Sequence, residues 1–296
     1  MFNRYALQTQ GILLSLFAML LFSINDGIYK YVLKLVPVEL AITLGFGFSF
    51  LFLMIYAGVK KLPVKPVRKR NAAVFSILFL VEQAMFLYAL RHVPMAELFV
   101  VILATPVFVL AFSSLILKEH LSKQQVLAIF LGFGGALVVV TGPLLLETPR
   151  DGLIHQDQTL AWLAAIANVC LNGSKILYLR KYCQTENNLS LSLCASLLLA
   201  LFFGVQLFRI DFEIPPHLWP WFIGCGLMSA IGFIGYVKAF QLTKAALVSA
   251  TQYSQIIWAV LMGVFIFREE LTLAAVTGSL LIMASGYFLY LKKQPV

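Results

Sequence analysis

The chain has 296 residues, of which 61% are hydrophobic and 12% are charged, and its formal net charge at pH 7 is +9. A soluble domain carries about a quarter charged residues, whereas the mean hydropathy here is +0.90. These values exclude a soluble globule, a disordered chain and a coiled coil. They predict that most of the chain lies in a lipid bilayer.

Ten apolar segments are long enough to cross a hydrocarbon layer of about 30 Å. The connections between them are short, so we expect an all-α integral membrane protein with ten transmembrane helices. The predicted spans are 11–33, 38–57, 72–90, 95–117, 125–141, 160–179, 189–208, 219–238, 245–267 and 273–291. The first span lacks a cleavage site of small residues, which predicts a retained helix and no cleaved signal peptide.

Basic residues determine the predicted orientation. With both termini in the cytoplasm, fifteen of the 22 Lys and Arg residues fall in cytoplasmic loops or helix ends, six fall on the opposite side and Lys175 falls inside a span. This bias is typical of cytoplasmic loops. The densest basic segment, 59–70, is therefore interpreted as a topological signal and not as a nucleic-acid site. The expected location is the inner membrane of a bacterium.

A weak internal repeat relates the two halves of the chain. A shift of 150 residues superposes segment 115–131 on segment 265–281 without a gap and pairs Glu119 with Glu269. Because each half holds an odd number of spans, the halves must insert with opposite orientations, which is typical of transporters. We therefore expect two inverted five-helix repeats, at residues 1–142 and 143–296.

Four segments stand out beside this repeat. They are SINDGIYKY in the first span, YALRHVPMAELFVVILATPVFV across the third and fourth, KEHLSKQQVLAIFLGFGGALVVV across the fourth and fifth, and REELTLAAVTGSLLIMASGYFL near the C-terminus. Together they resemble the drug/metabolite transporter superfamily, and within it the ten-span EamA type. The resemblance implies export of amino acids and related compounds, although some relatives import S-adenosylmethionine. The second span lacks the arginine that many members carry there.

Ionisable side chains inside the spans are the first candidates for function, because each costs roughly 2.5–3.5 kcal/mol to insert. Glu82 is the deepest carboxylate, and we expect it to bind a cationic group or a coupling proton, with a hydrogen-bonded structural glutamate as the alternative. Asp26 and Lys30 lie four residues apart, where they can form an ion pair or contribute to coupling or gating. Pro106 interrupts the fourth span, either as a simple kink or as a gating hinge.

Two polar stripes are expected to line a central cavity between the halves. The first comprises Glu97, Val101, Thr105 and Phe108, and its repeat equivalent comprises Leu247, Thr251, Gln255 and Trp258. The other candidates for substrate binding are Tyr88, Asn172, Lys175 and Gln252. Asn172 can equally join two helices by hydrogen bonds, and Lys175 can extend to the cytoplasmic interface.

Enzyme motifs are missing from the sequence. It contains four cysteines without a CxxC pair, and no HExxH, P-loop or GxSxG motif. We therefore expect no metal, no cofactor, no disulfide framework and no enzyme activity.

These features predict a secondary transporter of small polar metabolites that works by alternating access. The expected substrates are amino acids, amino-acid-derived zwitterions or organic cations, carried by a monomer with proton coupling or exchange and with membrane lipids as its surroundings. One alternative is an importer of S-adenosylmethionine or of nucleotide-derived metabolites. An alternative of another class is a non-transporting membrane enzyme or structural subunit.

Overall fold

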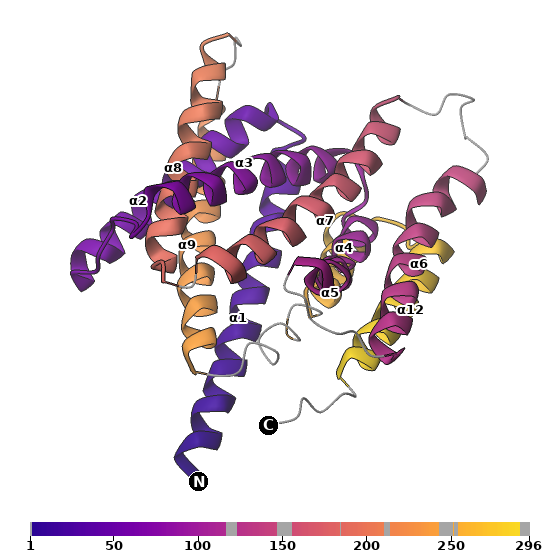
Figure 1. Cartoon of the computed structure of the whole chain (residues 1–296). Helices are drawn as coiled ribbons and strands as arrows, with labels where there is room; N and C mark the ends of the chain where they lie inside the picture. Colours follow the sequence, from indigo (N-terminus) through magenta and orange to yellow (C-terminus); the bar gives the residue numbers. More distant parts are fainter. Residues whose placement is uncertain are drawn as a thin grey trace.

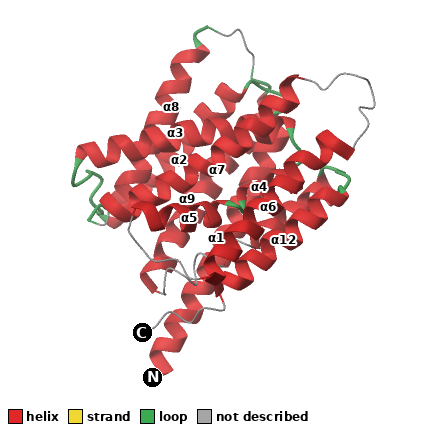
Figure 2. Ribbon diagram, turned by 45° about the vertical axis from the view of Figure 1, so that its right-hand side comes forward, coloured by secondary structure: helices red, strands yellow, loops and turns green. Residues whose placement is uncertain are grey.

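The computed structural model describes residues 2–116, 123–146, 156–183, 185–209, 214–242, 251 and 254–290. Every regular element in these ranges is a helix (Figure 2). The elements are α1 (Phe2–Val32), α2 (Val38–Lys60), α3 (Lys69–His92), α4 (Met95–Ile102), α5 (Thr105–Ile116), α6 (Lys123–Leu146), α7 (Gln156–Tyr182), α8 (Asn188–Leu207), η1 (Pro216–Leu218), α9 (Trp219–Leu242), α11 (Ser254–Leu261), η2 (Met262–Ile266) and α12 (Leu273–Tyr290).

Six helices contain segments that are long and apolar enough to cross a membrane. These segments are Thr9–Val32, Val38–Lys60, Lys69–His92, Asp157–Leu179, Leu189–Leu207 and Pro216–Tyr236. Shorter apolar helical segments occur at Met95–Val109, Phe130–Val139, Ile257–Ile266 and Leu273–Ala284. Large apolar side chains such as Phe130, Val205 and Phe208 are exposed, as expected where lipid is the solvent. The prediction of an all-α integral membrane protein is confirmed.

The fourth predicted span is not one continuous helix. Leu103 and Ala104 separate α4 from α5, and Pro106 lies in the first turn of α5. Proline has no backbone N–H to continue a helix, but it suits a first helical turn. The ninth predicted span also departs from an unbroken α-helix, because α11 continues into the π-helix η2. Residues 245–250, 252 and 253 of that span lie outside the described residues.

The helices pack in antiparallel pairs: α1 with α9, α2 with α8, α3 with α7 and α6 with α12 (Figure 1). In the first pair Gly224 lies near Ile28, whereas Gly235 lies near Leu14. In the other three pairs, too, the contacts move toward lower residue numbers in the second helix as they move toward higher numbers in the first. α2 meets α8 at Thr43 with Gly204 and at Gly47 with Ala200, and α3 meets α7 at Asn71 with Tyr182 and at Glu82 with Asn168. α6 meets α12 at Gly135 with Ile282 and at Val139 with Gly278. The two helices of each of these four pairs thus run in opposite directions.

The helix connections gather on two faces. Lys30 near the end of α1 contacts Val93, between α3 and α4, and Glu269, between η2 and α12. The α2–α3 connection instead contacts Glu186, between α7 and α8. We name the first face outer and the second face inner, after the predicted orientation. The beginning of α1 and the end of α12 lie at the same end of the molecule (Figure 1).

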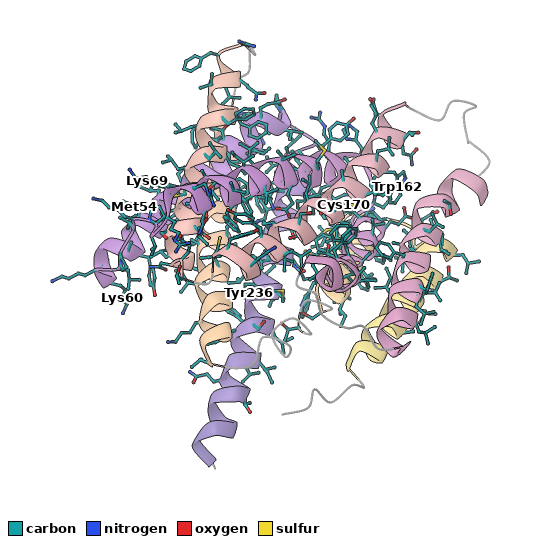
Figure 3. The ribbon with its side chains drawn as sticks, in the orientation of Figure 1. Met54, Lys60, Lys69, Trp162, Cys170 and Tyr236 are labelled. Carbon is teal, nitrogen blue, oxygen red and sulfur yellow. The ribbon has the colours of Figure 1, made fainter. Side chains whose placement is uncertain are left out.

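Glu186 holds the inner face together. Its carboxylate oxygens accept the backbone N–H groups of Val67 and Arg68, each at 2.8 Å. Burial raises the pKa of the neighbouring Cys183 thiol, and the negative charge of Glu186 raises that pKa further. Lys60 and Lys69 extend from the same end of the molecule (Figure 3). This buried carboxylate therefore ties the α2–α3 connection to the α7–α8 connection beneath a basic surface.

The backbones of α6 and α12 approach each other closely at Gly135 and Gly278. A Cβ atom added at Gly135 would lie 2.8 Å from the backbone oxygen of Gly278, and one added at Gly278 would lie 2.7 Å from the oxygen of Gly135. Backbone atoms cannot move aside as a flexible side chain can. Small residues at this crossing therefore set the distance between the two helices.

We predict that Gly135→Ala destabilises the protein by about 1–3 kcal/mol, because the added methyl overpacks the α6–α12 crossing. Gly134→Ala in the same helix is the matched control, since a Cβ there meets nothing within 4 Å. Unfolding by sodium dodecyl sulfate in mixed micelles, followed by tryptophan fluorescence, measures both variants. Equal stability of the two variants would contradict the close crossing.

Candidate functional site

An ion pair lies inside the membrane-spanning part of the protein, between α3 and α7. Lys175 Nζ donates to Glu82 Oε2 at 2.8 Å, and their side chains are 14% and 6% exposed. Glu82 is near the middle of α3, whereas Lys175 comes from the second half of the chain. Lys175 therefore does not extend to the cytoplasmic interface, and Glu82 is buried. The expected binding of a cationic group or a proton by Glu82 stays a prediction.

Polar and aromatic neighbours fix this ion pair in place. The buried Asn168 donates from Nδ2 to the backbone oxygen of Glu82 at 3.0 Å, and Gln83 Nε2 lies 3.4 Å from Glu82 Oε2. The ammonium of Lys175 lies 4.8 Å from the ring centre of Phe79, which adds a cation–π contact. Buried charges are tolerated when they are paired and hydrogen-bonded in this way.

Asp26 of α1 belongs to the same region. Its carboxyl group lies within electrostatic reach of Glu82, Tyr29 and Cys225. Within the described part of the chain, Asp26 has no hydrogen-bond or ion-pair partner. The region therefore contains two carboxylates and one ammonium group.

A second ion pair closes the outer face. Lys30 Nζ lies 2.7 Å from Glu269 Oε1 and also donates to the backbone oxygen of Val93 at 2.7 Å. The other carboxylate oxygen of Glu269 accepts the backbone N–H of Met95 at 2.8 Å. The expected pairing of Lys30 with Asp26 is wrong, because Lys30 instead joins α1 to the α3–α4 and η2–α12 connections.

Glu97 belongs to this outer cluster. Its Oε1 accepts a hydrogen bond from Thr272 Oγ1 at 2.7 Å, and the carboxylate lies within electrostatic reach of Lys30. Thr272 Oγ1 in turn accepts the N–H of Ala275 in the first turn of α12. Although Glu97 was predicted to bind substrate, its side chain in this structure holds the outer connections together.

The remaining predicted residues divide between packing positions and unpaired polar groups. Phe108 packs on Gly173 of α7, the Tyr88 ring lies tilted beside that of His92, and the hydroxyl of Thr251 is hydrogen-bonded to that of Ser15. The buried hydroxyl of Thr105 and the indole N–H of Trp258 have no partner among the described residues. Asn172 and Gln255 are half-buried. Gln252, the side chain of Pro106 and the central cavity that these residues were expected to share lie outside what the structure describes.

Two residues of these clusters were not among the predicted site residues. Glu269 was noted only as the repeat match of Glu119, and Asn168 was not singled out as a site residue. Their roles depend on residues 239 and 86 positions away, the side chain of Lys30 and the backbone oxygen of Glu82. The repeat alignment was the signal that could have singled out Glu269.

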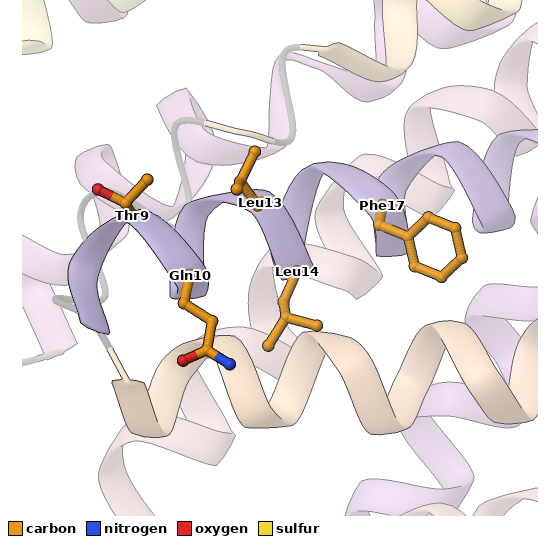
Figure 4. A pocket seen from close by; sticks show the side chains of 5 residues that line it. All are labelled: Thr9, Gln10, Leu13, Leu14 and Phe17. Atoms are coloured by element: carbon orange, nitrogen blue, oxygen red, sulfur yellow. The ribbon is translucent and has the colours of Figure 1, made fainter. Parts of the chain in front are cut away.

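A surface hollow of about 590 Å³ lies beside the first half of α1 (Figure 4). It is lined by Thr9, Gln10, Leu13, Leu14 and Phe17. This lining is largely apolar and contains no charged side chain. The hollow therefore does not suit a charged solute, and the ion-paired region between α3 and α7 is the better candidate site.

Paired charges inside a bundle of membrane helices are typical of membrane proteins that move polar solutes. The family model of the EamA-like transporter family matches this chain twice, over residues 9–141 and 159–291. The chain belongs to the EamA-like transporter family. The family resemblance predicted from the four sequence segments is confirmed, and the protein is a transporter and not an enzyme.

Known relatives agree with this assignment. Over 286 residues the chain is 23% identical to the pseudopaline exporter CntI of Pseudomonas aeruginosa, covering 93% of this chain and 94% of that protein. Over 207 residues it is 25% identical to human solute carrier family 35 member G1, covering 67% of this chain and 56% of that protein. A solved crystal structure shares the fold, with a TM-score of 0.63 at 17% identity over 98% of this chain and 96% of that one.

We predict that removing one member of the Glu82–Lys175 pair is much more damaging than removing both. Glu82→Gln or Lys175→Met alone leaves a buried charge unpaired and should cost about 3–5 kcal/mol of stability. The double variant removes both charges and should cost less than the sum of the two. Sodium dodecyl sulfate unfolding of all four proteins measures the coupling, and strictly additive effects would show that the two groups do not interact.

Proposed function

We propose that the protein is a secondary transporter that exports amino acids or amino-acid-derived zwitterions and organic cations across a bacterial inner membrane. It works as a monomer by alternating access between two inverted five-helix halves, residues 1–142 and 143–296. The observation that carries this proposal is the Glu82–Lys175 ion pair, which places both signs of charge between helices of the two halves.

The helix packing supports an inverted repeat. In such a repeat, α1, α2 and α3 correspond to α7, α8 and α9. The α1–α9 pair then corresponds to the α7–α3 pair, and the α2–α9 pair corresponds to the α8–α3 pair. All four pairs are observed. Equivalent helices α2 and α8 run antiparallel, as do α6 and α12. Opposite directions of equivalent helices are what inverted insertion requires.

The charges near Glu82 support the proposed substrates. An ammonium group on the solute can pair with a carboxylate of this region, and a solute carboxylate can pair with Lys175. When a zwitterion binds, its two charged groups therefore take the place of the partners that the protein charges had in their own ion pair. This exchange limits the free-energy cost of separating buried charges. The name of the relative CntI, an exporter, favours outward transport.

The Lys30–Glu269 pair supports a role for the outer cluster as a gate. Outward release of a solute requires α1 to separate from the α3–α4 and η2–α12 connections, and this buried pair joins all three. A pair excluded from water is stronger than an exposed one. The structure therefore corresponds to a state whose outer face is held closed.

We predict that purified protein in proteoliposomes catalyses counterflow of at least one amino acid, organic cation or S-adenosylmethionine. Glu82→Gln and Lys175→Met should each lower the initial rate by about tenfold or more, because each removes a charge worth about 1.5–3 kcal/mol to a charged ligand. Asp157→Asn, an exposed carboxylate at the start of α7, is the control and should keep the wild-type rate. Full activity of both site variants would exclude this region as the transport site.

We predict that breaking the outer ion pair opens the outer face. The readout is the reaction of a single cysteine, Thr105→Cys, in a variant whose four native cysteines are serine, with a membrane-impermeant thiol reagent. Glu269→Gln should raise the reaction rate about tenfold, because a lost buried ion pair shifts the conformational equilibrium by more than 1.4 kcal/mol. Glu270→Gln, at the exposed neighbouring carboxylate, should leave the rate unchanged.

The charge exchange Lys30→Glu with Glu269→Lys provides the reciprocal test. It rebuilds the attraction with the signs reversed, so the reaction rate at position 105 should fall back toward that of the parent. Equal rates in the parent and in Glu269→Gln would contradict the gate.

A further inference from the structure

The charges around Asp26 do not balance. Glu82 lies within electrostatic reach of Asp26 and is already paired with Lys175. Lys30, one turn further along α1, is engaged by Glu269 and Val93. Among the described residues, the Asp26 carboxyl group therefore has no cationic partner. A positive group on a bound solute can serve as that partner.

Two neighbours of Asp26 also lack hydrogen-bond partners. The side-chain oxygen of Asn25 and the hydroxyl of Tyr29 are buried and unpaired, and these residues are 7% and 2% exposed. Tyr29 is fixed by Phe46, on which its ring stacks, and by Gly45, against which its hydroxyl lies. Its hydroxyl group lies within electrostatic reach of Asp26. Buried polar groups in native proteins are almost always satisfied, so these oxygens indicate a missing partner.

The chemistry of the missing partner follows from the groups that lack one. A carboxylate and an amide oxygen accept hydrogen bonds, and a phenol hydroxyl can also accept one. A protonated primary amine provides three N–H donors together with a positive charge. A proton on Asp26 would remove the charge but would supply only one O–H donor, for which the oxygens of Asn25 and Tyr29 would compete. A divalent metal ion takes six or more oxygen ligands, which is more than this group offers.

We infer that Asp26, Asn25 and Tyr29 form a binding site for the protonated amino group of the transported solute. This inference rests on the proposed function and changes one part of it, since the amino group binds Asp26 and not Glu82, whose carboxylate Lys175 already neutralises. The transporter therefore selects solutes with a free, positively charged amine and rejects those in which the amine is acylated.

The first experiment measures binding of amines to the purified full-length protein in nanodiscs. The probes are L-methionine, L-lysine and S-adenosylmethionine, with N-acetyl-L-methionine and N-α-acetyl-L-methionine amide as analogues that lack the cationic amine. Wild type should prefer the free amines by about tenfold, the value of one charged hydrogen-bonded contact. Asp26→Asn should abolish this preference, Tyr29→Phe should reduce it, and Asp157→Asn should retain it. A preference that persists in Asp26→Asn overturns the inference.

The second experiment needs neither a known substrate nor transport. Dicyclohexylcarbodiimide modifies carboxyl groups within membranes, and mass spectrometry quantifies the adduct at Asp26. Methylammonium should slow this modification at least about threefold, whereas neutral acetamide at the same concentration should not, because only the cation can pair with the carboxylate. Equal effects of the two compounds overturn the inference. Protection by methylammonium in a protein that shows no counterflow would reject the transport proposal and keep the amine site.

Discussion

A charge inside a bilayer must have a partner, and this constraint organises the interior of the protein. Both ion pairs of the described chain cross between its first and second halves, Glu82 with Lys175 between α3 and α7 and Lys30 with Glu269 at the outer face. Apolar contacts between membrane helices contribute little specificity because lipid tails are equally apolar. Charge pairing therefore favours the contact of α3 with α7 and the contact of α1 with the η2–α12 connection. Both contacts join the first half of the chain to the second.

The sequence was sufficient for the membrane class, the helical fold and the position of Glu82 inside a span, because hydropathy and the cost of a buried charge are local properties. It was not sufficient for the partners. Spacing of four residues favoured Lys30 with Asp26, but the tertiary fold places Glu269 within 2.7 Å of Lys30. Lys175 was expected either to bind substrate or to extend to the interface, because its position along α7 does not reveal that Glu82 faces it. Partners remote in sequence become visible only when helix register is known.

Irregular backbone accompanies the outer ion pair. The π-helix η2 ends three residues before Glu269, and the N–H of Glu269 donates to the oxygen of Gly263 within it. A Cβ atom at Gly263 would lie 2.8 Å from Glu269 Oε2, so glycine leaves room for the carboxylate beside the helix. π-Helical turns concentrate at functional positions. Neither hydropathy nor the repeat predicted this turn. Both are patterns along the sequence, and they do not report where the side chain of Glu269 lies in three dimensions.

The two faces are closed by contacts of different kinds, and this difference bears on which face can open. On the inner face, Glu186 accepts two N–H groups of the α2–α3 connection, which lies outside the spans and is already next to water. On the outer face, Lys30 and Glu269 are 7% and 13% exposed. Water that enters between them raises the local dielectric and weakens their attraction, which admits more water. For the gate proposed above, the outer pair would therefore be either dry and closed or hydrated and open, as a two-state element requires.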